Sequence, residues 1–174
     1  NNPPDGAWLT PGINTLTIGA TTRSPIAFFL VPFMVVWSGG ALGGIYGSQL
    51  LNGKFNLMLS FFGIPFIAGS VLFWGFALMA VGGKVEITID RDGGKVYTGF
   101  RSLGITKRFT WEEITVAREG GVSFTYPGGH PASILLEGKK RISLGTGLNE
   151  ARRFYLLKAL QEVIRKKNAK QYFV

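Results

Sequence analysis

The sequence has no cysteine, a single histidine and few acidic side chains. Its 174 residues include 10 Asp and Glu against 19 Lys and Arg, which gives a formal net charge of +9. Without cysteine the chain forms no disulfide framework, no thiolate metal site and no cysteine nucleophile. The one histidine, His130, stands in a loop rich in proline and glycine without neighbouring carboxylates. We expect it to be a surface residue and not a catalytic base or metal ligand.

Residue patterns that carry catalysis are also missing. The serines and threonines have no paired base, and the adjacent Glu112 and Glu113 indicate a turn acid beside a solvated neighbour. Asp90 and Asp92 have the spacing of a calcium loop, but no run of oxygen ligands and no closing glutamate follow, so a turn is expected there. We therefore expect no catalytic residues, no metal and no cofactor of its own, and a protein that is not an enzyme.

Charge is almost absent from residues 25–83. Arg23, Lys54 and Lys84 bound two uncharged runs, each longer than the roughly 20 apolar residues that a helix needs to cross a hydrocarbon core of about 30 Å. Backbone polar groups must be paired in lipid, so both runs are predicted to be helices. The expected segments are an N-terminal lead (1–23), a transmembrane hairpin (24–83, with helices at about 25–47 and 57–81) and a C-terminal β domain (84–174).

Neither predicted span contains a charged residue or a histidine, which argues against a proton relay or ion pathway and favours an anchor or packing subunit. Small residues recur at spacings that let another backbone approach closely. Two interpretations stay open: these glycines pack against the hairpin's own second helix, or they dock onto a helix of a partner. The predicted helix-packing residues are Gly39, Gly40, Gly43, Gly44, Gly47, Gly63 and Gly69.

The flanks of the hairpin predict its orientation and the role of the N-terminal lead. Arg23 and Lys84 on one side outweigh Lys54 on the other, so the positive-inside rule places both termini and the C-terminal domain in the cytoplasm. In the lead, residues 16–22 have β character and are expected either to pair as an edge strand or to lie along the membrane surface. Trp8 is either an interfacial anchor at the headgroup layer or a cover for the adjacent domain.

From Lys84 onward the apolar residues alternate with period two, which indicates half-buried strands. Asn149 is a suitable N-cap for a closing amphipathic helix over residues 149–168. Seven short strands closed by such a helix describe the pleckstrin-homology (PH) fold. The predicted fold class is therefore a membrane α-hairpin of two transmembrane helices plus an all-β PH-like barrel or sandwich. The predicted strands cover residues 85–89, 96–100, 105–111, 114–118, 122–126, 133–137 and 141–144.

Basic residues gather in the last hairpin and the closing helix. They represent either a face that contacts anionic lipid or a solvated surface. Nucleic acid is not expected as a partner, because these residues are not interleaved with exposed aromatics. The residues are Lys139, Lys140, Arg141, Arg152, Arg153, Arg165, Lys166 and Lys167.

Two segments of the C-terminal half resemble a known family. The stretch KVEITIDRDGGKVYTGF…KRFTWEEITVAR and the later ILLEGKKRISLGTGLNEARRFYLLKALQEVI are similar to bacterial membrane-anchored PH-like domain proteins. The resemblance covers about residues 84–167. It implies a scaffold or assembly role at the bacterial inner membrane, without catalysis. Some relatives assemble photosynthetic complexes, so an energy-transducing complex is one candidate host.

Two functions follow as expectations. The first is an accessory or scaffold subunit, whose helices pack in the membrane against subunits of a larger integral membrane complex while the PH-like domain covers the cytoplasmic face. The alternative is an independent membrane-anchored module that binds anionic lipid headgroups through its basic residues.

Overall fold

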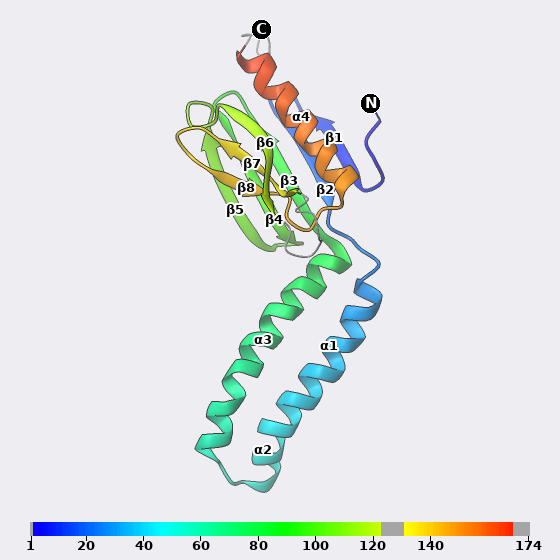
Figure 1. Cartoon of the computed structure of the whole chain (residues 1–174), viewed down its shortest axis with the longest axis vertical. Helices are drawn as coiled ribbons and strands as arrows, with labels where there is room; N and C mark the ends of the chain where they lie inside the picture. Colours follow the sequence, from blue (N-terminus) through cyan, green and yellow to red (C-terminus); the bar gives the residue numbers. More distant parts are fainter. Residues whose placement is uncertain (1, 123–130, 169–174) are drawn as a thin grey trace. The chain divides into compact units, whose positions relative to one another are not determined.

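A computed structural model describes residues 2–122 and 131–168 of the chain. The chain divides into two compact units, which we call the β unit (Asn1–Thr22 with Gly82–Val174) and the hairpin unit (Arg23–Val81). Figure 1 shows the helices and strands of both. The hairpin unit is thus inserted into the sequence of the β unit. The N-terminal lead, given above as a segment of its own, belongs to that same β unit.

The hairpin unit consists of two long apolar helices. The first runs through α1 (Ala27–Leu42), a π-helical turn η1 (Gly43–Gly47) and α2 (Ser48–Asn52), and the second is α3 (Leu57–Gly82). By length and composition, both the stretch Ala27–Asn52 and α3 suffice to cross a membrane. The first helix begins slightly later and ends five residues later than expected, because the π-helical turn carries it past residue 47 to Asn52.

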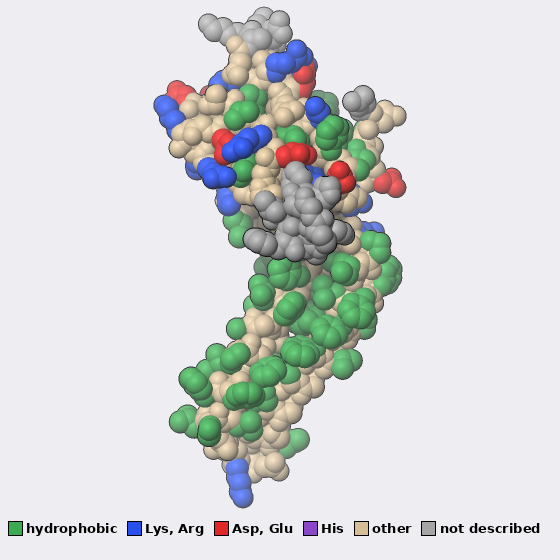
Figure 2. All heavy atoms as spheres, viewed as in Figure 1, with side chains coloured by type: hydrophobic (Ala, Val, Ile, Leu, Met, Phe, Trp, Pro, Cys, Tyr) green, Lys and Arg blue, Asp and Glu red, His purple; other side chains and the backbone are tan. Residues whose placement is uncertain are grey.

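Local features define the ends of these helices. The backbone of Gly53 adopts a left-handed conformation with φ 60°, which suits glycine and terminates α2. The side chain of Asn56 accepts a hydrogen bond from the N–H of Leu59 at 3.0 Å and so caps the start of α3. Before α1, the carbonyl of Ser24 accepts the N–H of Ala27 at 3.1 Å in a turn that leads into the helix. Large apolar side chains cover the outside of the hairpin unit, as Figure 2 shows.

The β unit contains a five-stranded antiparallel sheet in the order β1-β2-β3-β4-β5. Its strands are β1 (Ala7–Pro11), β2 (Leu16–Thr21), β3 (Gly83–Ile89), β4 (Gly93–Phe100) and β5 (Leu103–Thr110). The β structure expected for residues 16–22 is confirmed, but β2 is not an edge strand because β1 covers its outer side. Thr21 pairs with Lys84, so the 59-residue hairpin unit fills what would otherwise be the turn between two neighbouring strands.

A second, three-stranded sheet follows in the order β6-β7-β8, formed by β6 (Val116–Val122), β7 (Pro131–Glu137) and β8 (Ile142–Leu144). The prediction of separate strands at 114–118 and 122–126 is wrong in its first part, because residues 116–122 form one strand. Residues 123–126 lie outside the described residues. Within the described ranges the two sheets do not close into a barrel.

Helix α4 (Glu150–Asn168) packs on the sheets and completes the core. Its predicted N-cap is confirmed: Asn149 Oδ1 accepts the N–H of Arg152 at 2.9 Å. The alternating residues of β2 and β3 and the apolar stripe of α4 are buried together, as their periodicities predict. The buried residues include Ile18, Val85, Ile87, Ile89, Leu156, Leu160, Val163 and Ile164.

Candidate interaction surfaces

The glycines of the first long helix lie on open surface of the hairpin unit. A Cβ atom added at Gly39, Gly40, Gly43, Gly44 or Gly47 would meet no heavy atom within 4 Å, and the same holds for Gly69. A glycine that held two helices of this hairpin together would instead place its missing Cβ against the other helix. These six residues therefore have no close contact inside the hairpin unit that would require glycine, and docking onto a helix of a partner stays a prediction.

Gly63 is the exception among the predicted packing residues. It is buried, and a Cβ there would lie 2.4 Å from the hydroxyl oxygen of Tyr46 and 2.6–2.8 Å from two of its ring atoms. The Tyr46 hydroxyl donates to the carbonyl of Ser60 at 2.8 Å. Tyr46 lies in the π-helical turn, so this turn directs the ring onto Gly63. The spacing of the glycines along the sequence did not predict this contact between Tyr46 and Gly63, because it does not show which residue of the facing helix each glycine meets.

An aromatic ladder runs along the hairpin unit. Its rings have successive centroid distances of 5.7, 5.9, 6.1 and 5.8 Å and connect the two long helices. Such offset and tilted pairs are favourable beyond the burial of area. Four of its members are exposed and the fifth is half-buried, so the ladder also presents apolar surface outward. Its members are Phe29, Phe33, Trp37, Phe66 and Phe62.

The predicted basic residues of α4 lie on more than one side of the helix. On α4, Arg152 and Arg165 are thirteen positions apart, which places them on different sides of a helix with about 3.6 residues per turn. Arg153 is only 8% exposed. Arg152 ties the helix to the N-terminal strands, because its guanidinium donates to the carbonyls of Asp5 at 2.7 Å and Thr21 at 3.0 Å.

Most of the other basic residues contact an acidic side chain or a carbonyl of the chain itself. Arg165 and Lys166 lie 2.9 and 3.5 Å from Glu162, and Lys140 donates to the carbonyl of Arg108 at 2.8 Å. Lys167 donates to the carbonyl of Trp111 at 3.1 Å. Lys139 has no such contact among the described residues. Most of these residues therefore already contact groups of the chain itself, and their contact with anionic lipid stays a prediction.

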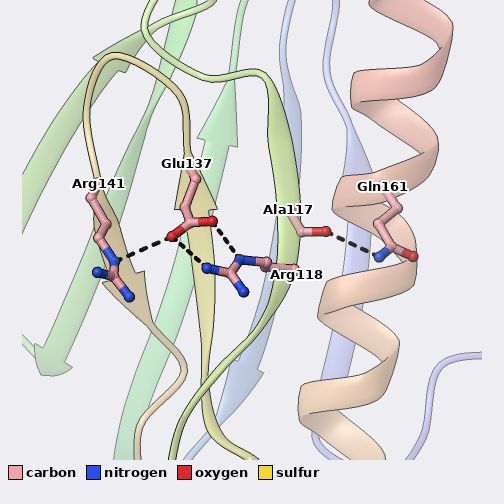
Figure 3. A network of polar contacts seen from close by, with 5 residues as sticks. All are labelled: Ala117, Arg118, Glu137, Arg141 and Gln161. Carbon is pink, nitrogen blue, oxygen red and sulfur yellow. Dashed lines mark hydrogen bonds and ion pairs between the residues drawn. The ribbon is translucent and has the colours of Figure 1, made fainter.

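Glu137 connects strands of the second sheet through two arginines, as Figure 3 shows. Arg118 of β6 donates to both of its oxygens, and Arg141 lies 3.3 Å from one of them. On the other side of β6, Gln161 of α4 donates to the carbonyl of Ala117 at 3.0 Å. Polar contacts thus hold β7, β6 and α4 in register across the sheet.

The pH dependence of stability follows from three such carboxylates. The hydrogen bond from Arg118 lowers the pKa of Glu137 below its usual 4.5, the backbone N–H of Thr110 lowers the pKa of Glu113, and Arg165 lowers that of Glu162. A carboxylate whose pKa is lower in the folded state than in the unfolded state stabilises the fold at any pH above its unfolded-state pKa. This stabilisation is lost as the pH falls through the folded-state pKa.

We therefore expect the melting temperature of the β unit to decrease once the pH drops below about 4.5. In this range the carboxylates of the unfolded chain start to bind protons before those of the folded chain. The measurement is a series of melting curves from pH 7 to pH 3. The variant Glu137→Gln should show a smaller acid-induced decrease, and an unchanged pH profile in this variant would contradict the assignment. All three groups are solvent-accessible, so the effect should shrink at high salt.

Trp8 lies in β1, and its ring covers Gly19 of the neighbouring strand. A Cβ at Gly19 would come within 2.4 Å of the indole ring. Trp8 thus covers part of the β unit, which is one of the two roles expected for it. Its role as a membrane anchor stays a prediction.

The turn between β3 and β4 borders a shallow groove of about 580 Å³. Asp90 Oδ1 accepts the N–H groups of Asp92 and Gly93 at 3.0 and 2.8 Å, so this segment is a hydrogen-bonded turn. The groove wall mixes the acids Asp90, Asp92 and Glu113 with basic residues. Within residues 2–122 and 131–168, no three His, Cys, Asp or Glu side chains are grouped as for a metal ion. His130 lies outside the described residues.

Compared with known proteins, the sequence matches no family model and no curated protein.

Proposed function

We propose that this chain is a non-catalytic accessory or scaffold subunit of a larger integral membrane complex. In this proposal the hairpin unit crosses the membrane and packs against helices of other subunits, while the β unit covers the cytoplasmic face. The observation that carries it is the set of open glycines on the first long helix, at which a Cβ would meet nothing within 4 Å. Close approach of another helix is the use that membrane proteins make of such positions.

Two further features support this role. Neither long helix contains a charged side chain, so nothing in them serves transport of ions or protons. Large apolar side chains are widely exposed on the hairpin unit, for example Phe28 at 87% and Met58 at 85%. A soluble surface rarely carries a contiguous apolar area of this kind, whereas lipid and partner helices both cover it.

The resemblance to bacterial membrane-anchored PH-like domain proteins suggests the location and the host. The order of a four-stranded meander β2-β5, a three-stranded meander β6-β8 and a closing helix supports a PH-like plan for the β unit, with β1 added at one edge. On this basis we place the protein in the bacterial inner membrane with both termini cytoplasmic. An energy-transducing complex, for instance a photosynthetic one, is the candidate host.

Extraction of native membranes in mild detergent tests the proposal. After a high-salt wash, size separation and mass spectrometry identify what travels with the chain. Co-migration with one large complex through the wash supports an accessory subunit, because apolar contacts between helices do not weaken with salt. Migration as a small free particle contradicts it.

The open glycines give a sharper prediction. The double variant Gly43→Leu and Gly44→Leu should weaken association with the complex at least about tenfold, which corresponds to about 1.4 kcal/mol, because the new side chains hold the partner helix away. The hairpin itself should still fold, since these positions meet nothing in the chain. Val36→Leu, at an exposed position of α1 in the same long helix, is the matched control and should leave co-migration unchanged. Equal co-migration of both variants would contradict the assigned interface.

Binding of anionic lipid remains a second candidate function, because residues 84–174 carry 17 Lys and Arg against 9 Asp and Glu, a net charge of +8. Attraction to an anionic leaflet weakens as salt screens it. The test uses the chain with the Gly43→Leu and Gly44→Leu substitutions. If its β unit binds to anionic vesicles and this binding weakens as the salt concentration rises, this candidate is favoured.

A further inference from the structure

The apolar core face of the five-stranded sheet continues beyond the core along β5. Side chains at every second position of this strand share one face, and Phe109 on that face is buried with 4% exposure. At the other end of the same row, Ile105 is 68% exposed and Leu103 is 70% exposed. Two large apolar side chains therefore stand uncovered on a sheet face whose other end is core.

The two-residue connection between β4 and β5 is held in a defined shape. Phe100 pairs with Leu103, and Tyr97 donates from its hydroxyl to the carbonyl of Arg101 at 2.7 Å. Arg101 has φ 52°, the one positive φ of a non-glycine residue among the described residues. A left-handed backbone is unfavourable for a residue with a side chain, and such outliers concentrate where function requires them. The turn thus presents a cation at its tip where glycine would fit more easily.

The charge of this segment has one sign. Residues 93–110 contain Lys95, Arg101, Lys107 and Arg108 and no Asp or Glu, so the β4–β5 hairpin carries a net charge of +4. Lys107 lies on the same face of β5 as Ile105 and Leu103. Apolar side chains flanked by cations match a lipid surface with anionic headgroups, where the apolar groups enter the interface and the cations meet phosphate.

The sheet register puts this turn near the start of β3, where the chain leaves α3. Leu103 pairs with Phe100, and Phe100 pairs with Gly83, the residue that follows the last residue of α3. Two strand spacings of 4.7–4.9 Å separate β5 from β3, which is about 10 Å. A 26-residue helix is about 39 Å long, longer than a hydrocarbon core of about 30 Å, so a spanning α3 would end in the headgroup layer.

We propose that the β4–β5 turn of this protein, with Leu103, Ile105 and Arg101, inserts into the headgroup layer of an anionic membrane. This inference rests on the proposed membrane crossing of the hairpin unit. It gives the β unit a second attachment to the lipid, which fixes its orientation on the membrane in addition to its covalent link. It also assigns the lipid contact to residues other than those of the last hairpin and α4.

The absence of cysteine makes the test direct, because one introduced cysteine carries one fluorescent label. The full chain is reconstituted in vesicles of phosphatidylcholine with phosphatidylglycerol, labelled at Leu103→Cys, at Asp92→Cys or at Val71→Cys. Asp92 is exposed on the turn at the opposite end of β4, about 25 Å away for eight residues, and is the matched control. Val71, 70% exposed on α3, reports the membrane crossing.

The label at position 103 should be quenched by lipid-attached nitroxide and be several-fold less accessible to aqueous iodide than the label at position 92. Arg101→Gln with Lys107→Gln, or vesicles without phosphatidylglycerol, should reduce the lipid quenching. Equal iodide quenching at positions 103 and 92 overturns the inference, and so does iodide protection at 103 without lipid quenching, which would indicate a second copy of the chain. Absence of lipid quenching at position 71 would instead overturn the membrane crossing and the proposed function with it.

Discussion

Replacing Trp111 by alanine should destabilise the β unit by about 3–5 kcal/mol, because the truncation leaves a cavity and an unpaired carbonyl. Trp111 is 7% exposed and packs edge-on against Phe109 with ring centroids 5.7 Å apart. Its indole N–H donates to the carbonyl of Asp90 at 3.0 Å. Lys167 lies over the ring at 5.8 Å and donates to the carbonyl of Trp111, so the end of α4 depends on it as well.

The loss is large against a typical stability of about 5–15 kcal/mol, so partial unfolding is expected under ordinary conditions. Backbone hydrogen exchange in detergent micelles measures it and distinguishes the β unit from the hairpin unit. Trp111→Phe keeps most of the ring and should retain more stability than the alanine variant. Leu103→Ala, at an exposed position of β5, should change stability little. Equal protection in Trp111→Ala and Leu103→Ala would show that Trp111 does not hold the core together.

A charge at the middle of α3 should prevent membrane insertion. Val71 lies near the centre of α3 and is 70% exposed. An arginine at the centre of a transmembrane helix costs about 2.5–3.5 kcal/mol of insertion free energy. The double variant Val71→Arg with Leu72→Arg roughly doubles this cost. The loss of membrane insertion should then be measurable even for a strongly apolar helix. The fraction of chain that resists alkaline extraction from membranes should fall accordingly.

The same substitutions have the opposite consequence if α3 lies in water. Exposed positions of a soluble protein accept such changes within about 0.5 kcal/mol, and added charge increases solubility. Val71→Leu is the control and should insert like the unmodified chain. Unchanged extraction of the arginine variants would therefore contradict the membrane crossing, on which the proposed accessory role depends.

Local patterns predicted much of the secondary structure. The two uncharged runs gave both long helices, since residues without charge over such a length are typical of membrane spans. The alternation of apolar and polar residues predicted β3, and the N-cap residue Asn149 together with the apolar stripe that follows it predicted α4. The sequence pattern predicts separate strands at residues 114–118 and 122–126, whereas residues 116–122 form the single strand β6, in which Gly120 pairs with Ser133 within the ladder.

Properties of the sequence itself determined the absence of cysteine and the character of the two halves: two uncharged runs separated by a turn that carries Lys54, and a basic remainder. Only the tertiary structure decided which residues are neighbours. Strand pairing brings Thr21 next to Lys84 across 62 intervening residues, and thereby makes the first residues part of the β unit. It also decided that Arg153 is buried, that Gly63 meets Tyr46 while Gly43 meets nothing, and that Leu103 stays uncovered. Periodicity reports which face of an element is apolar, but the partner of that face is set by long-range packing, which no local pattern encodes.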